Sequence, residues 1–369
     1  MTTLTEPKNV TSTDLCQSQR LCPPQGFWLL RFKFKQPYSL LLSKRAVAIN
    51  AGLSVLLLLL ITASLGLGNV NLSAGEVWQA LMQEGPALNQ LVVNELRLHR
   101  VIAGFATGAA FALSGCLMQT LSRNRLATPG IIGIDNAATA FAVASVIGTG
   151  IAVAPSAMAM VGAATAAALA FGLSGEAGRR GYRFIVAGIG IGAIAGAITQ
   201  FMLSRVAIDD ANAAFPWTVG SLNARNPEAT YLLCIGIVFA LICAARIARS
   251  MELIQLSEAA CISLGGHPEA IRRNGLLLSV GLTGLAVAVA GPVGLVALLG
   301  PEIARAMCKH RGIPLLSSAL MGAVIMLSAD LTGRLLLSPL EIPVGIVTAI
   351  VGSPYLLWML LNPSFKNKL

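Results

Sequence analysis

The stretch Ala46–Leu67, AVAINAGLSVLLLLLITASLGL, decides the fold class of this chain. It contains no charged residue, and Lys44 and Arg45 stand directly before it. Because about 20 apolar residues in a helix cross the hydrocarbon core of a bilayer, the stretch is predicted to be a transmembrane span. It is too long for the apolar region of a secretory signal, and residues 1–45 are too long and irregular for the region before one. The span is therefore expected to stay in the protein.

Comparable stretches recur to the C-terminus, and the composition agrees with them. The chain of 369 residues is 55% hydrophobic and 11% charged, whereas soluble domains carry about 25% charged residues. We therefore predict an all-α polytopic membrane protein with about ten transmembrane helices. The predicted spans are 46–67, 99–119, 131–149, 152–172, 183–204, 230–247, 274–290, 293–306, 315–334 and 343–361.

The basic residues indicate how these spans are oriented. With the N-terminus in the cytoplasm and the spans alternating, 21 of the 26 Lys and Arg residues fall on the cytoplasmic side. This is the bias that the positive-inside rule describes. The residues left outside are Arg97, Arg100, Arg205, Arg225 and Arg334. Topology thus explains most of the net charge of +10, and no nucleic-acid partner is predicted.

The predicted topology divides the chain into three parts. Residues 1–45 are expected to form a poorly ordered cytoplasmic tail, with basic residues near the headgroups of membrane lipid. Residues 46–362 form the transmembrane domain, and residues 363–369 form a cytoplasmic C-terminal tail. Two long polar loops stand out, 68–98 outside and 248–273 inside. In the inner loop, Leu253, Leu256 and Ala260 have the spacing of an amphipathic helix.

The sequence lacks the patterns of the enzyme classes that act in membranes. It has no Gly-Lys dipeptide, which excludes a P-loop for ATP. Gly172-Leu173-Ser174-Gly175 resembles the GxSG box of intramembrane serine proteases, but such a serine needs a histidine base. The three histidines lie at span edges or in loops, and the seven cysteines show no zinc-type pairing. No catalytic residue, metal or cofactor is predicted.

Only three carboxylates fall within the predicted spans, at Asp135, Glu302 and Asp330. Two of them have an arginine at helical spacing, because Arg305 follows Glu302 by three residues and Arg334 follows Asp330 by four. Intrahelical ion pairs are therefore expected at both places. A bare metal ion needs several oxygen ligands, and proton-coupled carriers keep ionisable relays in the membrane. The small number of unpaired charges within the predicted spans therefore favours a large cargo, or an ion wrapped in a chelator, over a bare ion.

A set of ordered segments between Ala46 and Leu361 carries a more specific pattern. They are Arg97-Leu98-His99-Arg100; Ser114-Gly115 with Gln119 and Arg123–Pro129; Gly133-Ile134; Trp217 with Gly220; Glu258–Ala260 with Leu264-Gly265; Gly291–Val293 with Gly300–Arg305; Ala329-Asp330 with Arg334; and Glu341–Gly345 with Thr348-Ala349 and Gly352–Pro354. In this order they resemble the FecCD family, the permease subunits of ABC importers for ferric siderophores, haem and vitamin B12. The ordered set is far more specific than any one segment.

The chain departs from the family pattern at five positions. Proline is replaced by His99 and Arg125, histidine by Glu302, phenylalanine by Leu295 and glycine by Ala297. These departures leave the expected fold unchanged. They bear on which chelate is carried and on whether the chain is one half of a heterodimer or part of a homodimer.

The resemblance implies a type II ABC importer permease fold in the bacterial cytoplasmic (inner) membrane, with both termini cytoplasmic and no ATPase site of its own. The implied partners are an ABC ATPase subunit, a soluble or lipoprotein substrate-binding protein and a second permease subunit. The implied cargo is a ferric siderophore, and cobalamin or haem import stays open. A secondary carrier for a small solute also stays open, although no repeat between the two halves is visible.

The resemblance further implies roles for three sets of residues. Arg97, Arg100 and Arg334 match positions that dock the binding protein, although arginines at span ends also snorkel without such a role. The coupling helix that seats in the ATPase matches Glu258, Ala259, Ala260, Leu264 and Gly265. An outer gate would include Trp217, Gly220, Gly291 and Pro292, although glycine and proline are also ordinary at span ends.

Overall fold

The computed structural model describes residues 27–33, 37–68, 70–148, 153–178, 182–223, 225–309 and 312–361. Residues 1–26 of the predicted N-terminal tail and the whole predicted C-terminal tail lie outside the described residues. So do eight of the basic residues predicted to be cytoplasmic: Lys8, Arg20, Lys35, Arg179, Arg180, Arg311, Lys366 and Lys368. The chain divides into two compact units, Met1–Ala48 and Ile49–Leu369.

The first unit contains a β-hairpin, which the sequence did not lead us to expect. Strand β1 (Phe27–Lys33) pairs antiparallel with β2 (Pro37–Ser43), with Phe27 opposite Ser43 and Lys33 opposite Pro37. Aromatic residues favour strands, and Pro37 occupies the first position of a strand, where proline is tolerated. From Lys44 onward the described residues form only helices and their connections, so the all-α prediction is confirmed for that part of the chain.

Each predicted span corresponds to one helix. In chain order these are α2 (Lys44–Gly66), α5 (His99–Ser122), α6 (Ile134–Val146), α7 (Pro155–Gly178), α8 (Tyr182–Leu203), α10 (Pro227–Leu256), α12 (Pro268–Ala290), α13 (Gly294–Cys308), α14 (Leu315–Leu335) and α15 (Val344–Leu361). Among the described residues, seven helices are long and apolar enough to cross a membrane, and α6 and most of α15 form shorter apolar helices. The chain is therefore a multi-pass membrane protein.

Short helical elements lie between the spans. They are α3 (Ala74–Leu81), α4 (Ala87–Gln90), the π-helix η1 (Leu91–Leu98), the 3₁₀-helix η2 (Pro129–Ile132), α9 (Ile208–Val219) and α11 (Glu258–Ser263). The predicted loop 68–98 is thus largely helical, and α3 begins with a capping box in which Ser73 and Glu76 satisfy each other's backbone N–H groups. The predicted amphipathic helix of the inner loop is broken at Ser257, because Leu253 and Leu256 end α10 and Ala260 belongs to α11.

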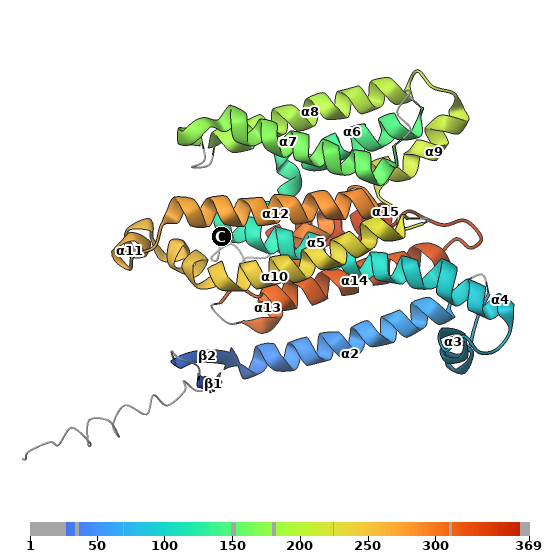
Figure 1. The fold of residues 1–369 in the computed structure, drawn as a ribbon, viewed down its shortest axis with the longest axis horizontal. Coiled ribbons are helices and arrows are strands. Elements are labelled where there is room, and N and C mark those ends of the chain that lie inside the picture. The colour runs from blue at the N-terminus through green and yellow to red at the C-terminus, as the bar shows by residue number, and fades with distance from the viewer. Residues whose placement is uncertain are drawn as a thin grey trace, which may run out of the picture. The chain divides into compact units, whose positions relative to one another are not determined.

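Helix α5 forms the centre of the second unit. It packs against α10, α12, α13 and α14, and Figure 1 shows it enclosed by these helices. Small residues allow the backbones to approach closely. A Cβ on Gly108 would overlap the carbonyl of Gly322 in α14, and a Cβ on Gly115 would overlap the carbonyl of Ala297 in α13. Close packing of this kind holds helices together in lipid, where the hydrophobic effect between helices is absent.

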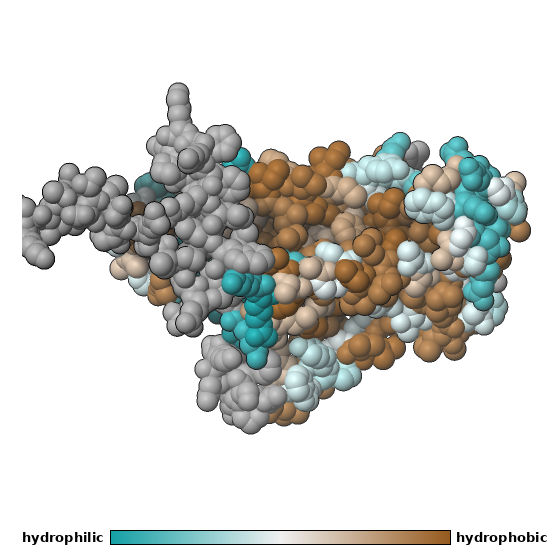
Figure 2. Space-filling model, turned by 90° about the horizontal axis from the view of Figure 1, so that it is seen from below, coloured by the Kyte–Doolittle hydropathy of each residue, from teal (hydrophilic) through white to brown (hydrophobic). Residues whose placement is uncertain are grey.

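The outer surface of the helices is apolar. Val55, Leu58 and Leu59 of α2 are each more than half exposed. On the face drawn in Figure 2, hydrophobic residues cover the middle of the helices and hydrophilic residues gather at helix ends. Such a surface suits the hydrocarbon core of a bilayer, with the polar ends of the helices in the headgroup regions.

Candidate functional site

Arg97 joins the end of the first span to the start of the second. Its guanidinium donates to the carbonyl oxygens of Leu65 (2.6 Å) and Gly66 (3.1 Å) at the end of α2 and to that of Val70 (2.5 Å). The last carbonyl groups of a helix lack partners within the helix, and a cation there also interacts favourably with the helix dipole. The side chain is buried, so its hydrogen bonds fix the position of η1 and α5 against α2.

Asp330 holds two further arginines. Arg100 donates to its carboxylate from Nε, at 3.0 and 3.2 Å, and Nη2 of Arg100 lies 2.9 Å from Oδ1. The predicted intrahelical pair is confirmed, because Nε of Arg334 lies 3.2 Å from Oδ2 of Asp330. Asp330 itself is 3% exposed. A second carboxylate, Glu341, accepts a hydrogen bond of 2.7 Å from Nη1 of Arg100.

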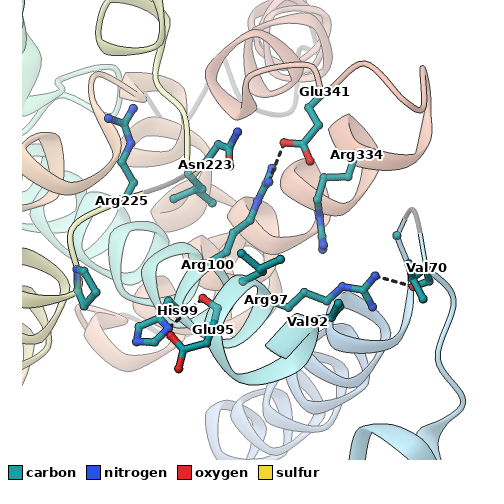
Figure 3. A pocket seen from close by; sticks show the side chains of 14 residues that line it. Val70, Val92, Glu95, Arg97, His99, Arg100, Asn223, Arg225, Arg334 and Glu341 are labelled. Carbon is teal, nitrogen blue, oxygen red and sulfur yellow. Dashed lines mark hydrogen bonds and ion pairs between the residues drawn. The ribbon is translucent and has the colours of Figure 1, made fainter. Parts of the chain in front are cut away.

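These side chains surround a depression of about 430 Å³, named here the arginine pocket. Figure 3 shows how they come from different elements, with the Arg100 guanidinium directed at Glu341. Its charged lining consists of Arg97, Arg100, Arg225, Arg334, Glu95 and Glu341. The arginines outnumber the carboxylates, so the pocket is suited to a negatively charged group. The structure thus brings together the three arginines predicted to dock a partner, with Arg97 and Arg334 largely buried.

Arg225 was not predicted to join this site, although its place among the five outer arginines was a signal. Its guanidinium lies 4.0 Å from the centre of the Trp217 ring, and it donates to the carbonyl oxygens of Ser221 (2.8 Å) and Pro216 (3.3 Å). Burial lowers the pKa of Arg225 to about 10, so the group stays positively charged at neutral pH.

The four residues predicted to form a gate, Trp217, Gly220, Gly291 and Pro292, lie together. Gly345 of α15, which was not among the predicted gate residues, joins them, and we name these five residues the glycine junction. Gly220 and Gly291 have φ angles of 83° and 75°, which favour glycine. A Cβ on Gly220 would lie 2.6 Å from the carbonyl oxygen of Pro292, and one on Gly345 would overlap the carbonyl oxygen of Val219. The N–H of Gly345 donates to the carbonyl of Gly220 (3.1 Å). The ends of α9 and α12 and the start of α15 are therefore held in direct backbone contact.

The predicted coupling residues lie in and directly after α11. Ser257 caps this helix, because its Oγ accepts a hydrogen bond from the N–H of Ala260 (2.9 Å), and Glu258 forms an ion pair with Arg272. Leu264 is 68% exposed and Ile262 is 61% exposed. Gly265 has a φ of 78°, which ends the turn. The segment therefore presents apolar side chains on its surface, as a docking helix would.

A second charged cluster involves Glu302 in α13, which is 1% exposed. The predicted pair with Arg305 is confirmed, with Nη1 of Arg305 at 3.4 Å. A second arginine, Arg125, lies 3.2 Å from Glu302, and Arg305 also donates to Gln119 (2.5 Å). Two departures from the family pattern, Arg125 and Glu302, thus contact one another. Of the two ion pairs that Glu302 forms within the described residues, the loss of Arg125 would leave the longer one.

We expect Arg125 and Glu302 to be energetically coupled. In a double-mutant cycle with Arg125→Gln and Glu302→Gln, the double variant should lose about 0.5–2 kcal/mol less stability than the two single variants together, since either change alone removes the same contact. Thermal unfolding of the purified chain in detergent measures this. Arg123→Gln is the matched control, because Arg123 donates to the carbonyl of Ile254 instead. Additive losses for Arg125 and Glu302 would disprove the coupling.

No group of three His, Cys, Asp or Glu side chains within the described residues lies close enough to hold a metal ion. The Ser174 hydroxyl donates to the carbonyl of Phe171 in its own helix (3.0 Å). The described part of the chain thus offers charged and apolar recognition surfaces at the arginine pocket and at α11.

Comparison with known proteins gives consistent matches over most of the chain. Residues 56–362 match the sequence model of the FecCD transport family. The ferric enterobactin transport system permease protein FepG of Escherichia coli is 34% identical over 301 residues, which cover 81% of this chain and 91% of FepG. The achromobactin transport system permease protein CbrC of Dickeya dadantii is 35% identical over 320 residues, covering 84% and 89%.

Two further matches concern another cargo and a solved structure. The hemin transport system permease protein HmuU of Yersinia pestis is 33% identical over 320 residues, covering 84% of this chain and 94% of HmuU. A solved ABC transporter of the metal-chelate type, in an inward-facing conformation, superposes with a TM-score of 0.73 at 24% identity, covering 85% of this chain and 99% of that one. The match to the solved structure supports the fold predicted for this chain.

Proposed function

The chain belongs to the FecCD transport family, and on that premise we propose that it is the transmembrane permease subunit of an ABC importer for ferric siderophores. Relatives of similar length are named as permeases for ferric enterobactin and achromobactin. Haem is the second candidate cargo, because HmuU is similar over a comparable share of the chain. Cobalamin import and secondary transport have no specific observation in their favour.

The observation that carries the proposal is the presence of two different recognition surfaces. The arginine pocket has an excess of positive charge, and α11 with its C-terminal turn exposes Ile262 and Leu264. We assign the pocket to the outer side and α11 to the cytoplasmic side, since 21 of 26 basic residues then lie in the cytoplasm. The protein would lie in the bacterial cytoplasmic (inner) membrane with both termini inside.

The arginine pocket would receive acidic side chains of a substrate-binding protein. Charges at such an interface accelerate encounter and fix orientation more than they add affinity. Arg100 and Arg225 are partly accessible and could contact the partner directly. Arg97 and Arg334 are buried and would support the site by holding the spans in place. The adjacent glycine junction would then be the gate through which the cargo leaves the binding protein.

The energy would come from a separate ATPase, because the sequence holds no P-loop. Two ATPase subunits would dock on α11 of two permease subunits, and the second permease could be the same chain or a different one. Exposed apolar residues on α8, among them Ile189, Ile194 and Phe201, are available to membrane lipid or to that second subunit.

Replacing Leu264 by serine should weaken ATPase docking without unfolding the chain. Its side chain is exposed, so the change removes apolar contact area only from the complex. We expect at least about a tenfold loss of ATPase affinity, as for a buried apolar anchor of an interface. Leu88→Ser is the matched control, because Leu88 is 62% exposed and belongs to α4, which lies at the other end of the helices from α11 (Figure 1). Equal ATPase binding by both variants would contradict the docking role of α11.

The proposed function is tested by purification of the tagged chain together with an ABC ATPase and a substrate-binding protein from the same organism. A stable complex whose ATP hydrolysis rises when chelate-loaded binding protein is added is expected. Ferric catecholate, ferric citrate, ferric hydroxamate and hemin, each loaded on the binding protein, would identify the cargo. If the chain purified in active form without any ATPase, the proposal would fail.

A further inference from the structure

Glu341 forms an ion pair with Arg100, one of the arginines that the proposed docking needs. Its Oε2 accepts a hydrogen bond of 2.7 Å from Nη1 of Arg100, and this contact is seen directly in Figure 3. Glu341 is 37% exposed, whereas Arg100 is 12% and Asp330 is 3% exposed. Of the two carboxylates that hold Arg100, Glu341 is therefore the one that can move into solvent at low cost.

Glu341 is also joined by a short segment to the glycine junction. Ile342 follows it and donates its N–H to the carbonyl of Gly333 in α14 (3.0 Å). Gly345, four residues after Glu341, donates to the carbonyl of Gly220, and a Cβ added to Gly345 would overlap the carbonyl oxygen of Val219. A displacement of Glu341 would thus pull on the start of α15, which is one side of the junction.

We propose that Glu341 is a built-in competitor for Arg100, which a carboxylate of the docking binding protein displaces, and that its release loosens the glycine junction. This inference rests on the proposed function and adds to it the residue that links docking to the gate. In the undocked state Glu341 neutralises Arg100 and holds the segment 341–345 in place. In the docked state the partner's carboxylate takes over Arg100, and the segment becomes free to move.

The exchange is energetically feasible because one carboxylate replaces another. Arg100 keeps its buried partner Asp330 throughout, so no guanidinium is left without a charge partner. The released Glu341 regains hydration, since a large part of its side chain is already exposed. Because Glu341 is already partly exposed, its ion pair with Arg100 contributes little, so the competition should change binding only by about two- to fivefold.

The test uses Glu341→Gln, which removes the charge and keeps the shape of the side chain. Glu95→Gln is the matched control, because Glu95 lines the same pocket but pairs with no arginine in the part of the chain that the structure describes. The first readout is the rate at which phenylglyoxal modifies Arg100 in the permease–ATPase complex, followed by peptide mass spectrometry. The second is the affinity of the complex for the chelate-loaded binding protein of the same organism. The third is the uptake per docked complex.

Glu341→Gln should raise the rate of Arg100 modification and tighten docking, each by about two- to fivefold, while Glu95→Gln leaves the modification rate unchanged. Uptake per docked complex should fall, because in this variant the segment 341–345 is already free before docking. Docking then no longer triggers the loosening of the glycine junction. A merely structural role for Glu341 would weaken docking, and that outcome would overturn the inference, as would equal Arg100 modification in both variants. Failure of the wild-type complex to bind any such protein would refute the proposed function instead, and the modification rates would still report on the Arg100–Glu341 contact.

Discussion

Replacing Asp330 by alanine is expected to prevent the accumulation of folded protein. Asp330 is 3% exposed and is the shared partner of Arg100 and Arg334. Its loss would leave the Arg334 guanidinium buried with no carboxylate within ion-pair distance among the described residues. Breaking a buried ion pair by removing one member costs about 3–5 kcal/mol, which is a large part of the stability of an ordinary protein.

Thermal unfolding in detergent, with the amount of monodisperse protein, measures this effect. Asp210→Ala is the matched control, since Asp210 is an exposed residue of α9. We expect the control to unfold at the temperature of the unchanged chain. If Asp330→Ala unfolded together with the control, the charge cluster would not be what fastens α5 to α14.

Replacing Gly345 by alanine should strongly reduce transport while the chain still folds. The added Cβ would overlap the carbonyl oxygen of Val219, so α15 could no longer start against α9. The hydrogen bond from Gly345 to the Gly220 carbonyl would be lost with it. If the glycine junction is the gate, we expect uptake to fall by more than about tenfold, as misplacement by about 1 Å is sufficient for large losses in positioned sites.

Gly281→Ala in α12 is the control, because a Cβ there meets nothing within 4 Å. Iron-chelate uptake in cells, normalised to the amount of each chain in the membrane, separates transport from expression. Retained uptake by Gly345→Ala would show that the close contact at the junction is dispensable.

The sequence was sufficient to predict the spans because the bilayer imposes a length on apolar stretches. It was less informative about where helices end. Helix α10 continues to Leu256, well past the predicted end at 247, because its last turns carry Arg249 and Glu252, which lower the hydropathy but still form a helix. Hydropathy reports the part in lipid, whereas the helix ends at the Ser257 cap.

Short helices between the spans were not predicted, although one of them carries a local sequence signal. Ser73 and Glu76 have the spacing of a capping box, which would have indicated α3 within the predicted loop. The hairpin β1–β2 lies in the predicted tail, where charged and aromatic residues alternate too irregularly for a strand pattern to be recognised.

The candidate sites were predictable in part. The resemblance placed Arg97, Arg100 and Arg334 in one role, and the structure brings them to one pocket. Within a helix, spacing was enough to pair Asp330 with Arg334. Contacts between distant segments were not predictable from one sequence, because spacing carries no information about them. Arg125 with Glu302 and Arg100 with Glu341 are of this kind.

The most direct test of the account is uptake into proteoliposomes of purified components. The liposomes hold the chain, with a second permease if one co-purifies, and its ATPase, and the binding protein outside carries a radiolabelled ferric siderophore. Accumulation of label only when ATP, ATPase and binding protein are all present is predicted. Accumulation by the chain alone, without nucleotide or any other subunit, would contradict the account.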